Sequence, residues 1–173
     1  MTILSFLGLL SYVLVASLQA SIAVDSILQP TSQMSGSMAL VSKGEIFELG
    51  FFSPGNSGKH YLGIWYKNIP IQTVVWVANR VNPIKDSSVT ATLTLNTTGS
   101  LVLTQNDTVI WYSTSLKQVQ NPVAKLLDSG NFVVRDGEDN NPEAYLWQSF
   151  DYPTDTLLSG MKLGCDLKAV RKR

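Results

Sequence analysis

The sequence predicts an all-β protein in which antiparallel sheets surround a shared axis lined with tryptophan. Short runs rich in Val, Ile, Leu, Thr and aromatic residues alternate with turn residues, and no helical pattern separates them. In addition, Trp76 precedes Trp111 by 35 residues, and Trp111 precedes Trp147 by 36. Near-equal spacing of this kind is typical of repeated units that bury their apolar faces against one another. Three sheets meeting at a tryptophan core satisfy both observations.

The predicted strands follow one another between Gly, Pro, Asn and Asp turn signals. Runs of this length without interleaved helices favour an antiparallel sandwich, barrel or prism over a parallel α/β sheet. In chain order, the predicted strands are residues 38–41, 46–52, 61–66, 73–78, 92–95, 101–104, 109–113, 123–127, 132–135 and 145–148.

An internal repeat favours an arrangement of three sheets among these antiparallel folds. One copy runs from Gly99 through an apolar run and a hairpin to Trp111, and the next runs from Gly130 to Trp147. A third, looser copy runs from residues 50–52 to residues 64–66. Because a strand tryptophan is more often a core residue than a sugar-stacking platform, we expect Trp76, Trp111 and Trp147 to lie inside the protein.

The N-terminal segment has the pattern of a signal peptide. Residues 1–24 contain no Lys, Arg, Asp or Glu, and an apolar run over residues 3–20 is followed by small residues at Ser21 and Ala23. This pattern predicts a signal peptide at residues 1–23, cleaved after Ala23. A signal anchor is the alternative, but the first lysine is Lys43 and no basic cluster flanks the run. We therefore expect an exported mature chain without a membrane span.

Composition excludes several classes of function. Lys and Arg total 13, as do Asp and Glu, so no basic field for nucleic acid exists. One His and one Cys cannot supply a zinc site, a Cys–His nucleophile pair or a disulfide framework, and we expect no metal or cofactor. An acidic cluster could suggest calcium or paired-carboxylate catalysis, but interspersed Gly, Asn and Pro favour a solvated loop at Asp136, Glu138, Asp139 and Glu143.

Five sequence blocks carry a family resemblance that covers nearly the whole mature chain. They are ELGFFSPG at residues 48–55, YLGIWY at 61–66, VWVANR at 75–80, LLDSGNFVV at 126–134 and LWQSFDYPTDT at 146–156. In this order they resemble the start of the ectodomain of plant S-locus glycoproteins and G-type lectin S-receptor-like serine/threonine kinases. The resemblance implies a bulb-type mannose-lectin domain of the β-prism II fold, with three antiparallel sheets in a pseudo-threefold arrangement. It also implies a division into a lectin domain at residues 24–150 and the start of the S-locus glycoprotein region at 151–173.

The resemblance further implies a sugar site of the form Gln-x-Asp-x-Asn-x-Val-x-Tyr on one strand of each sheet. Alternate residues of a strand share one face, so these polar side chains can converge on sugar hydroxyls. The second copy, residues 96, 98, 100, 102 and 104, retains only Val102. The third, residues 127, 129, 131, 133 and 135, retains Asn131 and Val133, and the first, placed at residues 46, 48, 50, 52 and 54, retains none. We therefore expect a degenerate sugar site.

Two glycosylation sequons lie beside turns. They are Asn96-Thr97-Thr98 and Asn106-Asp107-Thr108, and neither contains Pro at its middle position. In an exported chain they predict N-linked glycans at Asn96 and Asn106. Because Asn96 occupies the Gln position of a former sugar site, a glycan there would cover the cleft.

Two functions remain open, both for a secreted, apoplastic chain. One is an extracellular recognition module that senses a protein or glycan ligand, with pollen recognition and defence among the roles that the resemblance implies. The other is a stand-alone mannose-binding lectin. No phosphate-binding loop or kinase catalytic-loop pattern is present, so we expect no enzymatic activity, although the related full-length receptors at the plasma membrane carry a kinase. Three origins of the sequence stay open: a truncated gene product, an incomplete gene model or an ectodomain fragment. The lectin domain or the receptor could also form an oligomer.

Overall fold

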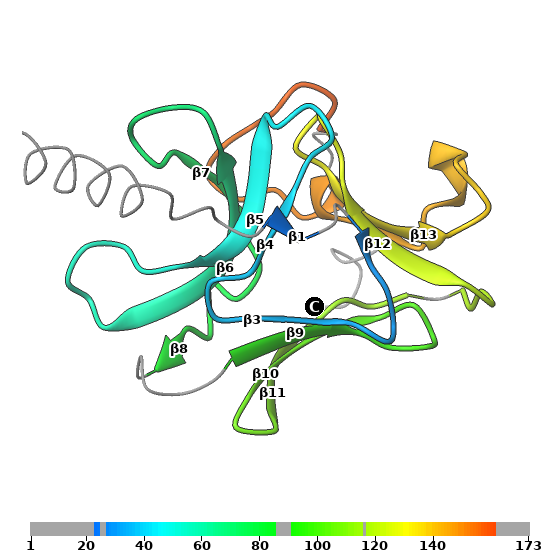
Figure 1. Ribbon diagram of the computed structural model, residues 1–173, viewed down its shortest axis with the longest axis horizontal. Helices are drawn as coiled ribbons and strands as arrows, with labels where there is room; N and C mark the ends of the chain where they lie inside the picture. Colours follow the sequence, from blue (N-terminus) through cyan, green and yellow to red (C-terminus); the bar gives the residue numbers. More distant parts are fainter. Residues whose placement is uncertain (1–22, 25–26, 86–90, 116, 162–173) are drawn as a thin grey trace, which may run out of the picture.

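The computed structural model describes residues 23–24, 27–85, 91–115 and 117–161. Three β-sheets surround a common centre, and Figure 1 shows them on the left, the right and the lower side of the molecule. Each sheet contains a path of four hydrogen-bonded strands, and the first adds two short strands to it. Within the described residues all strand pairs are antiparallel except β1–β4. The predicted all-β fold with three antiparallel sheets is confirmed.

The strands fall into three groups. The first sheet contains β1 (Ala23–Val24), β4 (Ala39–Val41), β5 (Phe47–Phe52), β6 (Lys59–Tyr66), β7 (Val74–Val77) and β8 (Ile84–Lys85). The second contains β3 (Gln33–Ser35), β9 (Ala91–Leu95), β10 (Leu101–Gln105) and β11 (Thr108–Tyr112). The third contains β2 (Ile27–Leu28), β12 (Pro122–Leu126), β13 (Phe132–Asp136) and β14 (Trp147–Gln148), and two 3-10 turns, η1 (Pro142–Ala144) and η2 (Ser149–Asp151), lie next to β14 in the sequence.

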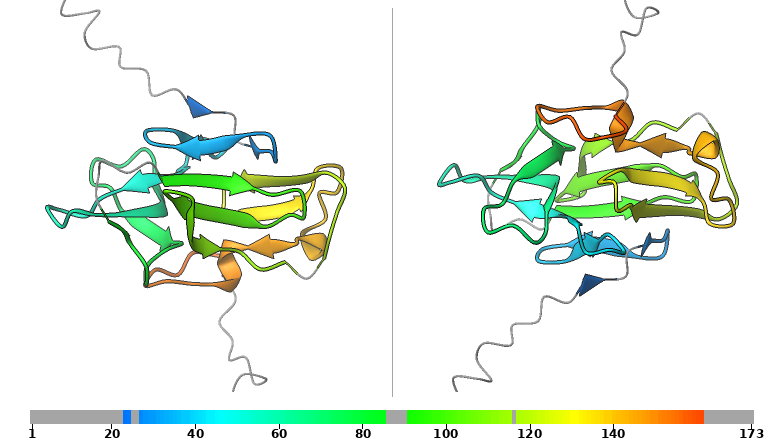
Figure 2. Two further views of the ribbon diagram at one scale, coloured as in Figure 1. Left: turned by 90° about the horizontal axis from the view of Figure 1, so that it is seen from below. Right: turned by 90° about the horizontal axis from the view of Figure 1, so that it is seen from above.

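The strand order makes the three sheets equivalent. The paths are β4-β5-β6-β7, β3-β9-β10-β11 and β2-β12-β13-β14. Three short strands near the N-terminus, β2, β3 and β4, therefore place one strand in each sheet. Their most buried side chains are Leu28, Met34 and Leu40, which are 2%, 1% and 0% exposed. Figure 2 shows this segment in blue at one end of the molecule and residues 149–161, in orange to red, at the opposite end. The N-terminal segment thus ties the three sheets together.

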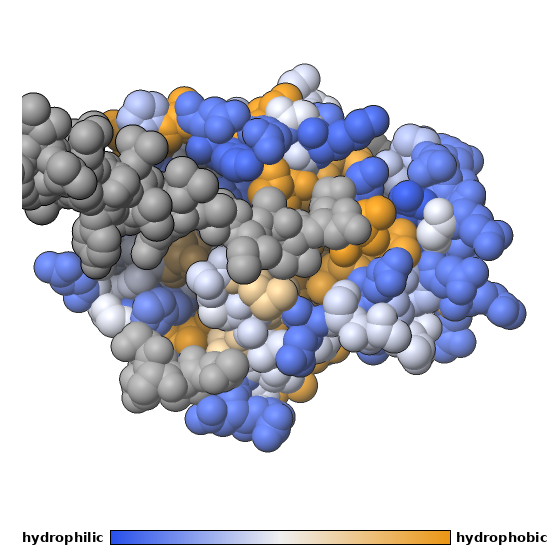
Figure 3. Space-filling view, in the orientation of Figure 1, coloured by the Kyte–Doolittle hydropathy of each residue, from blue (hydrophilic) through white to orange (hydrophobic). Residues whose placement is uncertain are grey.

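Alternating burial explains why these sequences form half-buried strands. In β9 and β12 every second residue is buried, as expected when one face of a strand packs inward. The inward residues form one continuous core that includes Leu49, Leu93 and Leu126. In Figure 3, which shows the end of the molecule with the N-terminal strands, hydrophilic residues dominate the rim and apolar residues appear toward the middle.

Three tryptophans meet at the centre, one from the last strand of each sheet path. The ring centroids of Trp76, Trp111 and Trp147 are 5.8–6.1 Å apart, and each pair is close to edge-to-face. Edge-to-face contact places the positive ring edge against the negative ring face, which stabilises such pairs. Trp76 and Trp147 are buried, as predicted, but Trp111 is only half-buried. The looser repeat copy ending at Trp65 is wrong, because Trp76 is the first-sheet counterpart of Trp111 and Trp147.

Candidate functional site

Val102 and Val133 lie on β10 and β13, the third strands of their paths, and Asn131 directly precedes β13. One hydrogen bond from the neighbouring strand aligns each of these strands. Two residues after Trp111, Ser113 Oγ accepts a hydrogen bond from Leu101 N at 2.8 Å. Two residues after Trp147, Ser149 Oγ accepts one from Phe132 N at 2.9 Å. These buried serines were not predicted, although the shared Trp-x-Ser pattern could have identified them.

The first sheet uses an asparagine for the same purpose. Asn79 Oδ1 accepts a hydrogen bond from Leu62 N at 2.9 Å. Asn79 lies three residues after Trp76, because the position two residues after Trp76 is Ala78, which pairs with Leu62 through its main chain but has no hydroxyl. Leu62 on β6 therefore corresponds to Leu101 on β10 and Phe132 on β13. This correspondence fixes which residues of the first sheet are equivalent to the sugar positions of the other two.

The placement of the first sugar-site copy at residues 46–54 is wrong. Those residues lie on and around β5, which is equivalent to β9 and β12 rather than to β10 and β13. A short motif can be aligned to the wrong strand of a hairpin, because the two adjacent strands have similar residue patterns. The equivalent positions in the first sheet are Ser57, Lys59, Tyr61, Gly63 and Trp65, none of which matches the sugar motif.

In the second copy, Asn96 acts as a local turn residue. Its Oδ1 accepts hydrogen bonds from Thr98 N (3.1 Å), Thr98 Oγ1 (2.8 Å) and Ser100 N (2.7 Å). Such a side chain–backbone turn is typical of Asn. Val102 lies farther along, half-buried on the outward face of β10. Its main-chain oxygen accepts a hydrogen bond from the hydroxyl of Thr94 at 3.4 Å.

In the third copy, Asn131 is bonded within the protein. It is 6% exposed, and its Nδ2 donates a hydrogen bond to Gln148 Oε1 at 2.9 Å. Its Oδ1 accepts from Ser149 Oγ at 3.2 Å and from Phe150 N at 3.3 Å. Val133, on the same face of β13, is 0% exposed. The polar group that the sequence singled out therefore connects β13 to the segment after Trp147.

The acidic loop is organised by an arginine next to it. Arg135 is 8% exposed, and its Nη1 donates hydrogen bonds to the main-chain oxygens of Asp136 (2.6 Å), Gly137 (3.0 Å) and Asp139 (3.0 Å). Glu138 and Asp139 are exposed, as a solvated loop requires. Across residues 23–24, 27–85, 91–115 and 117–161, no cluster of three His, Cys, Asp or Glu side chains could hold a metal ion.

Both predicted glycosylation asparagines are exposed at turns. Asn96 precedes the β9–β10 turn, and Asn106 lies in the two-residue β10–β11 turn with Asp107. The φ angles of Asn106 and Asp107 are 48° and 61°, which is the left-handed region that a type I′ hairpin turn requires and that Asn and Asp tolerate.

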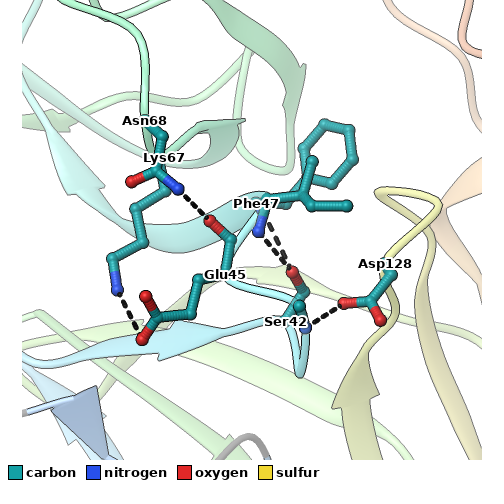
Figure 4. Close-up of polar contacts among 8 residues, drawn as sticks. Ser42, Glu45, Phe47, Lys67, Asn68 and Asp128 are labelled. Carbon is teal, nitrogen blue, oxygen red and sulfur yellow. Dashed lines mark hydrogen bonds and ion pairs between the residues drawn. The ribbon is translucent and has the colours of Figure 1, made fainter.

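A polar junction joins the first and third sheets at their turns, and Figure 4 shows it. The Gly44 N–H donates a hydrogen bond to Asp128 Oδ1 at 2.6 Å, across 84 residues of sequence. Ser42 Oγ accepts from Phe47 N at 3.1 Å, and Lys67 Nζ lies 3.5 Å from Glu45 Oε1. Asp128 belongs to the LLDSGNFVV block, so one reason for this residue type is the contact between sheets.

The comparisons with known proteins agree with this architecture. A family model described as D-mannose binding lectin matches residues 73–173. The chain belongs to this lectin family. The lectin is also similar in fold to the monomeric monocot mannose-binding lectins from Gastrodia elata, with a TM-score of 0.51, 18% identity and coverage of 72% of this chain and 96% of that one. The predicted resemblance and fold are confirmed.

Sequence relatives connect the lectin to receptor-like kinases and S-locus glycoproteins. It is 53% identical over 138 residues to the receptor-like serine/threonine-protein kinase SD1-8 of Arabidopsis thaliana, covering 78% of this chain and 16% of that protein. It is 48% identical over 144 residues to the S-locus-specific glycoprotein S6 of Brassica oleracea, covering 82% and 32%. The lectin thus spans no more than about a third of either relative's length. Within its described residues, no helix is long and apolar enough to cross a membrane.

Proposed function

We propose that this lectin is an extracellular recognition module of the S-domain receptor type, with degenerate strand sugar sites. It binds a protein or glycan ligand on loops or on a composite surface rather than through the Gln-x-Asp-x-Asn-x-Val-x-Tyr positions. The supporting observation is the position of Asn131, whose side chain is bonded to Gln148, Ser149 and Phe150. Any sugar hydroxyl would have to replace these internal hydrogen bonds, and such an exchange gains little free energy.

The module is non-catalytic and exported in this proposal. Residues 1–23 form the signal peptide, residues 24–150 the lectin domain, and residues 151–173 the start of the following region. Tyr152 and Thr154 of that last segment lie against the first sheet. The product resides in the apoplast, whereas longer relatives would hold the same domain at the plasma membrane. Pollen recognition and defence signalling are roles of this kind, and oligomerisation through the lectin domain is part of the proposal.

N-linked glycans at Asn96 and Asn106 belong to the same proposal. Both asparagines are exposed, and both sequon threonines, Thr98 and Thr108, are exposed as well. Mass spectrometry of plant-expressed protein before and after glycosidase treatment tests them. Thr98→Ala and Thr108→Ala should each remove one glycan.

A stand-alone mannose-binding lectin is the second candidate, favoured by the family match and by the fold of the Gastrodia elata lectins. A glycan array probed with the deglycosylated mature chain separates the two. Strong mannose signals that disappear in Asn131→Ala would favour the second candidate. Weak or non-mannose signals that are insensitive to this substitution are expected for the recognition module.

A further inference from the structure

One residue of the C-terminal segment makes the tryptophan centre asymmetric. The ring of Tyr152 stacks on Trp147, with centroids 5.8 Å apart and an interplanar angle of 18°. Its main-chain oxygen accepts a hydrogen bond from Trp76 Nε1 at 3.0 Å. Trp111 is half-buried, whereas the other two indoles are buried. Because Tyr152 covers two of three indoles, the threefold arrangement is open on the Trp111 side.

A pocket occupies that open side. It measures about 180 Å³ and contacts all three indoles, Tyr152, and the segment from Tyr112 to Thr114. A neighbouring groove of about 400 Å³ shares Val77, Ala78, Trp111 and Tyr152 with it and continues along residues 79–82. Well-packed interiors contain few spaces larger than a water molecule, so a space of this size beside the three indoles belongs to the surface and not to the core. The pocket volume is also smaller than the roughly 300–1,000 Å³ of a site for a drug-sized ligand. A pocket of this volume suits a ligand group of one six-membered ring.

The lining of the pocket indicates the chemistry of its occupant. No residue that lines the smaller pocket carries a charge, and the lining combines three tryptophans and two tyrosines with the hydroxyl-bearing residues Ser113 and Thr114. Thr114 is exposed, so its hydroxyl can donate and accept hydrogen bonds there. In the groove, Arg80 is paired with Asp155 at 3.3 Å, which leaves little net charge there. An uncharged ring with an apolar face and polar edges fits this combination.

Exposed apolar residues surround the same opening. Tyr112 and Tyr152 are 61% and 51% exposed, and Val81 at the groove is 95% exposed. Clustering of large exposed apolar side chains around one concavity is typical of a binding site.

We propose that this pocket, formed by Trp111 and its neighbours, binds an uncharged pyranose ring of a glycan, with the groove holding the adjoining sugar. The ring stacks on Trp111, and the hydroxyl of Thr114 bonds to its polar edge. The proposal rests on the glycan ligand of the proposed function, and it places that ligand away from the strand positions of Val102, Asn131 and Val133.

Nuclear magnetic resonance on the mature chain labelled with nitrogen-15 tests the site. We expect the four tryptophans to give separate indole N–H signals, which Trp→Phe variants assign, and Trp65 on the outward face of β6 is an internal reference. Methyl pyranosides of mannose, glucose, galactose and N-acetylglucosamine, followed by mannotriose, are titrated in. We expect a saturable shift of the Trp111 signal and none of the Trp65 signal.

Two variants with matched controls identify the pocket. Ala78→Leu should fill it and abolish the shift, whereas Ala144→Leu, at a half-buried alanine outside the pocket, should not. Tyr112→Ala, at an exposed residue, should weaken binding at least about tenfold, whereas Ile71→Ala, at a residue 80% exposed elsewhere, should leave it unchanged.

Three results would overturn the proposal. Shifts on β10 or β13 without one at Trp111 would keep glycan recognition but reject this pocket. A Trp111 response to isobutanol but to no saccharide would assign the pocket to an apolar side chain of a protein partner. No response to any saccharide would also reject the pocket, and a separate glycan-array signal would then show whether glycan recognition itself survives.

Discussion

Trp76 donates its indole N–H to the main-chain oxygen of Tyr152 at 3.0 Å, although 76 residues separate them. The same tyrosine stacks on Trp147. A segment that follows the last strand therefore closes a centre built from all three sheets. Thr154 Oγ1 continues this contact by donating a hydrogen bond to Val75 O at 3.1 Å.

The tryptophans should differ in their contributions to stability. Trp147→Ala should lower the free energy of unfolding by about 3–5 kcal/mol, because it removes a buried indole from the core. Trp111→Ala should cost less, since that ring is half-buried. Urea denaturation followed by circular dichroism measures both. An equal or greater loss for Trp111→Ala would contradict the exposure difference.

Two facing glycines on β5 and β6 should respond differently to a methyl group. A Cβ at Gly63 would lie 2.6 Å from a Phe52 ring carbon and 2.8 Å from the main-chain oxygen of Trp76, and backbone cannot rotate away. A Cβ at Gly50 would lie 2.8 Å from the edge of the Trp65 ring, which can move. Gly63→Ala should therefore destabilise by roughly 1–3 kcal/mol and Gly50→Ala by less. Thermal unfolding of the two variants measures the two losses of stability. A larger loss for Gly50→Ala would show that the main chain of β7 moves more readily than the Trp65 indole.

Mannose should bind weakly or not at all at the strand positions. Val102 and Val133 are apolar, and only Asn131 could recognise a hydroxyl with its side chain. One neutral hydrogen bond contributes about 0.5–1.5 kcal/mol net, whereas millimolar affinity requires about 4 kcal/mol. Calorimetric titration of the deglycosylated chain with mannose and mannotriose should therefore show no binding tighter than millimolar that depends on Asn131. Micromolar binding that Asn131→Ala abolishes, in a variant that remains folded, would restore the simple lectin.

Processing should leave Val24 as the first residue of the secreted chain. Residues 1–22 lie outside the described residues, and Ala23 opens β1, where it pairs with Ala39. Cleavage after Ala23 would leave only Val24 in that short strand. N-terminal sequencing of the secreted protein measures the cleavage point. A membrane-bound product that retains residues 1–23 would indicate a signal anchor.

The sequence alone predicted the strands whose residues show an alternating pattern between turn signals. Each predicted run overlaps an observed strand, because alternating β-branched residues bounded by turns encode local structure without distant partners. The four short strands β1, β2, β3 and β8 were missed, because two or three residues contain no period and become strands only through pairing. The tryptophan interval likewise predicted the centre, since a repeat length is a property of the chain.

Only the tertiary structure shows what the predicted sugar-site residues do. The sequence identified Asn131 and Val133 as sugar-site remnants, but only the folded chain shows that the amide of Asn131 is bonded to residues 17 to 19 positions away. It also placed the counterpart of the sugar strand on β6 rather than β5, because strand order depends on pairing between sheets and not on local similarity. The opening beside Trp111 has the same origin. Tyr152 contacts the indoles of Trp76 and Trp147 but leaves the third indole of the centre open. This asymmetry depends on the path of the chain after the last strand and not on the sequence repeat.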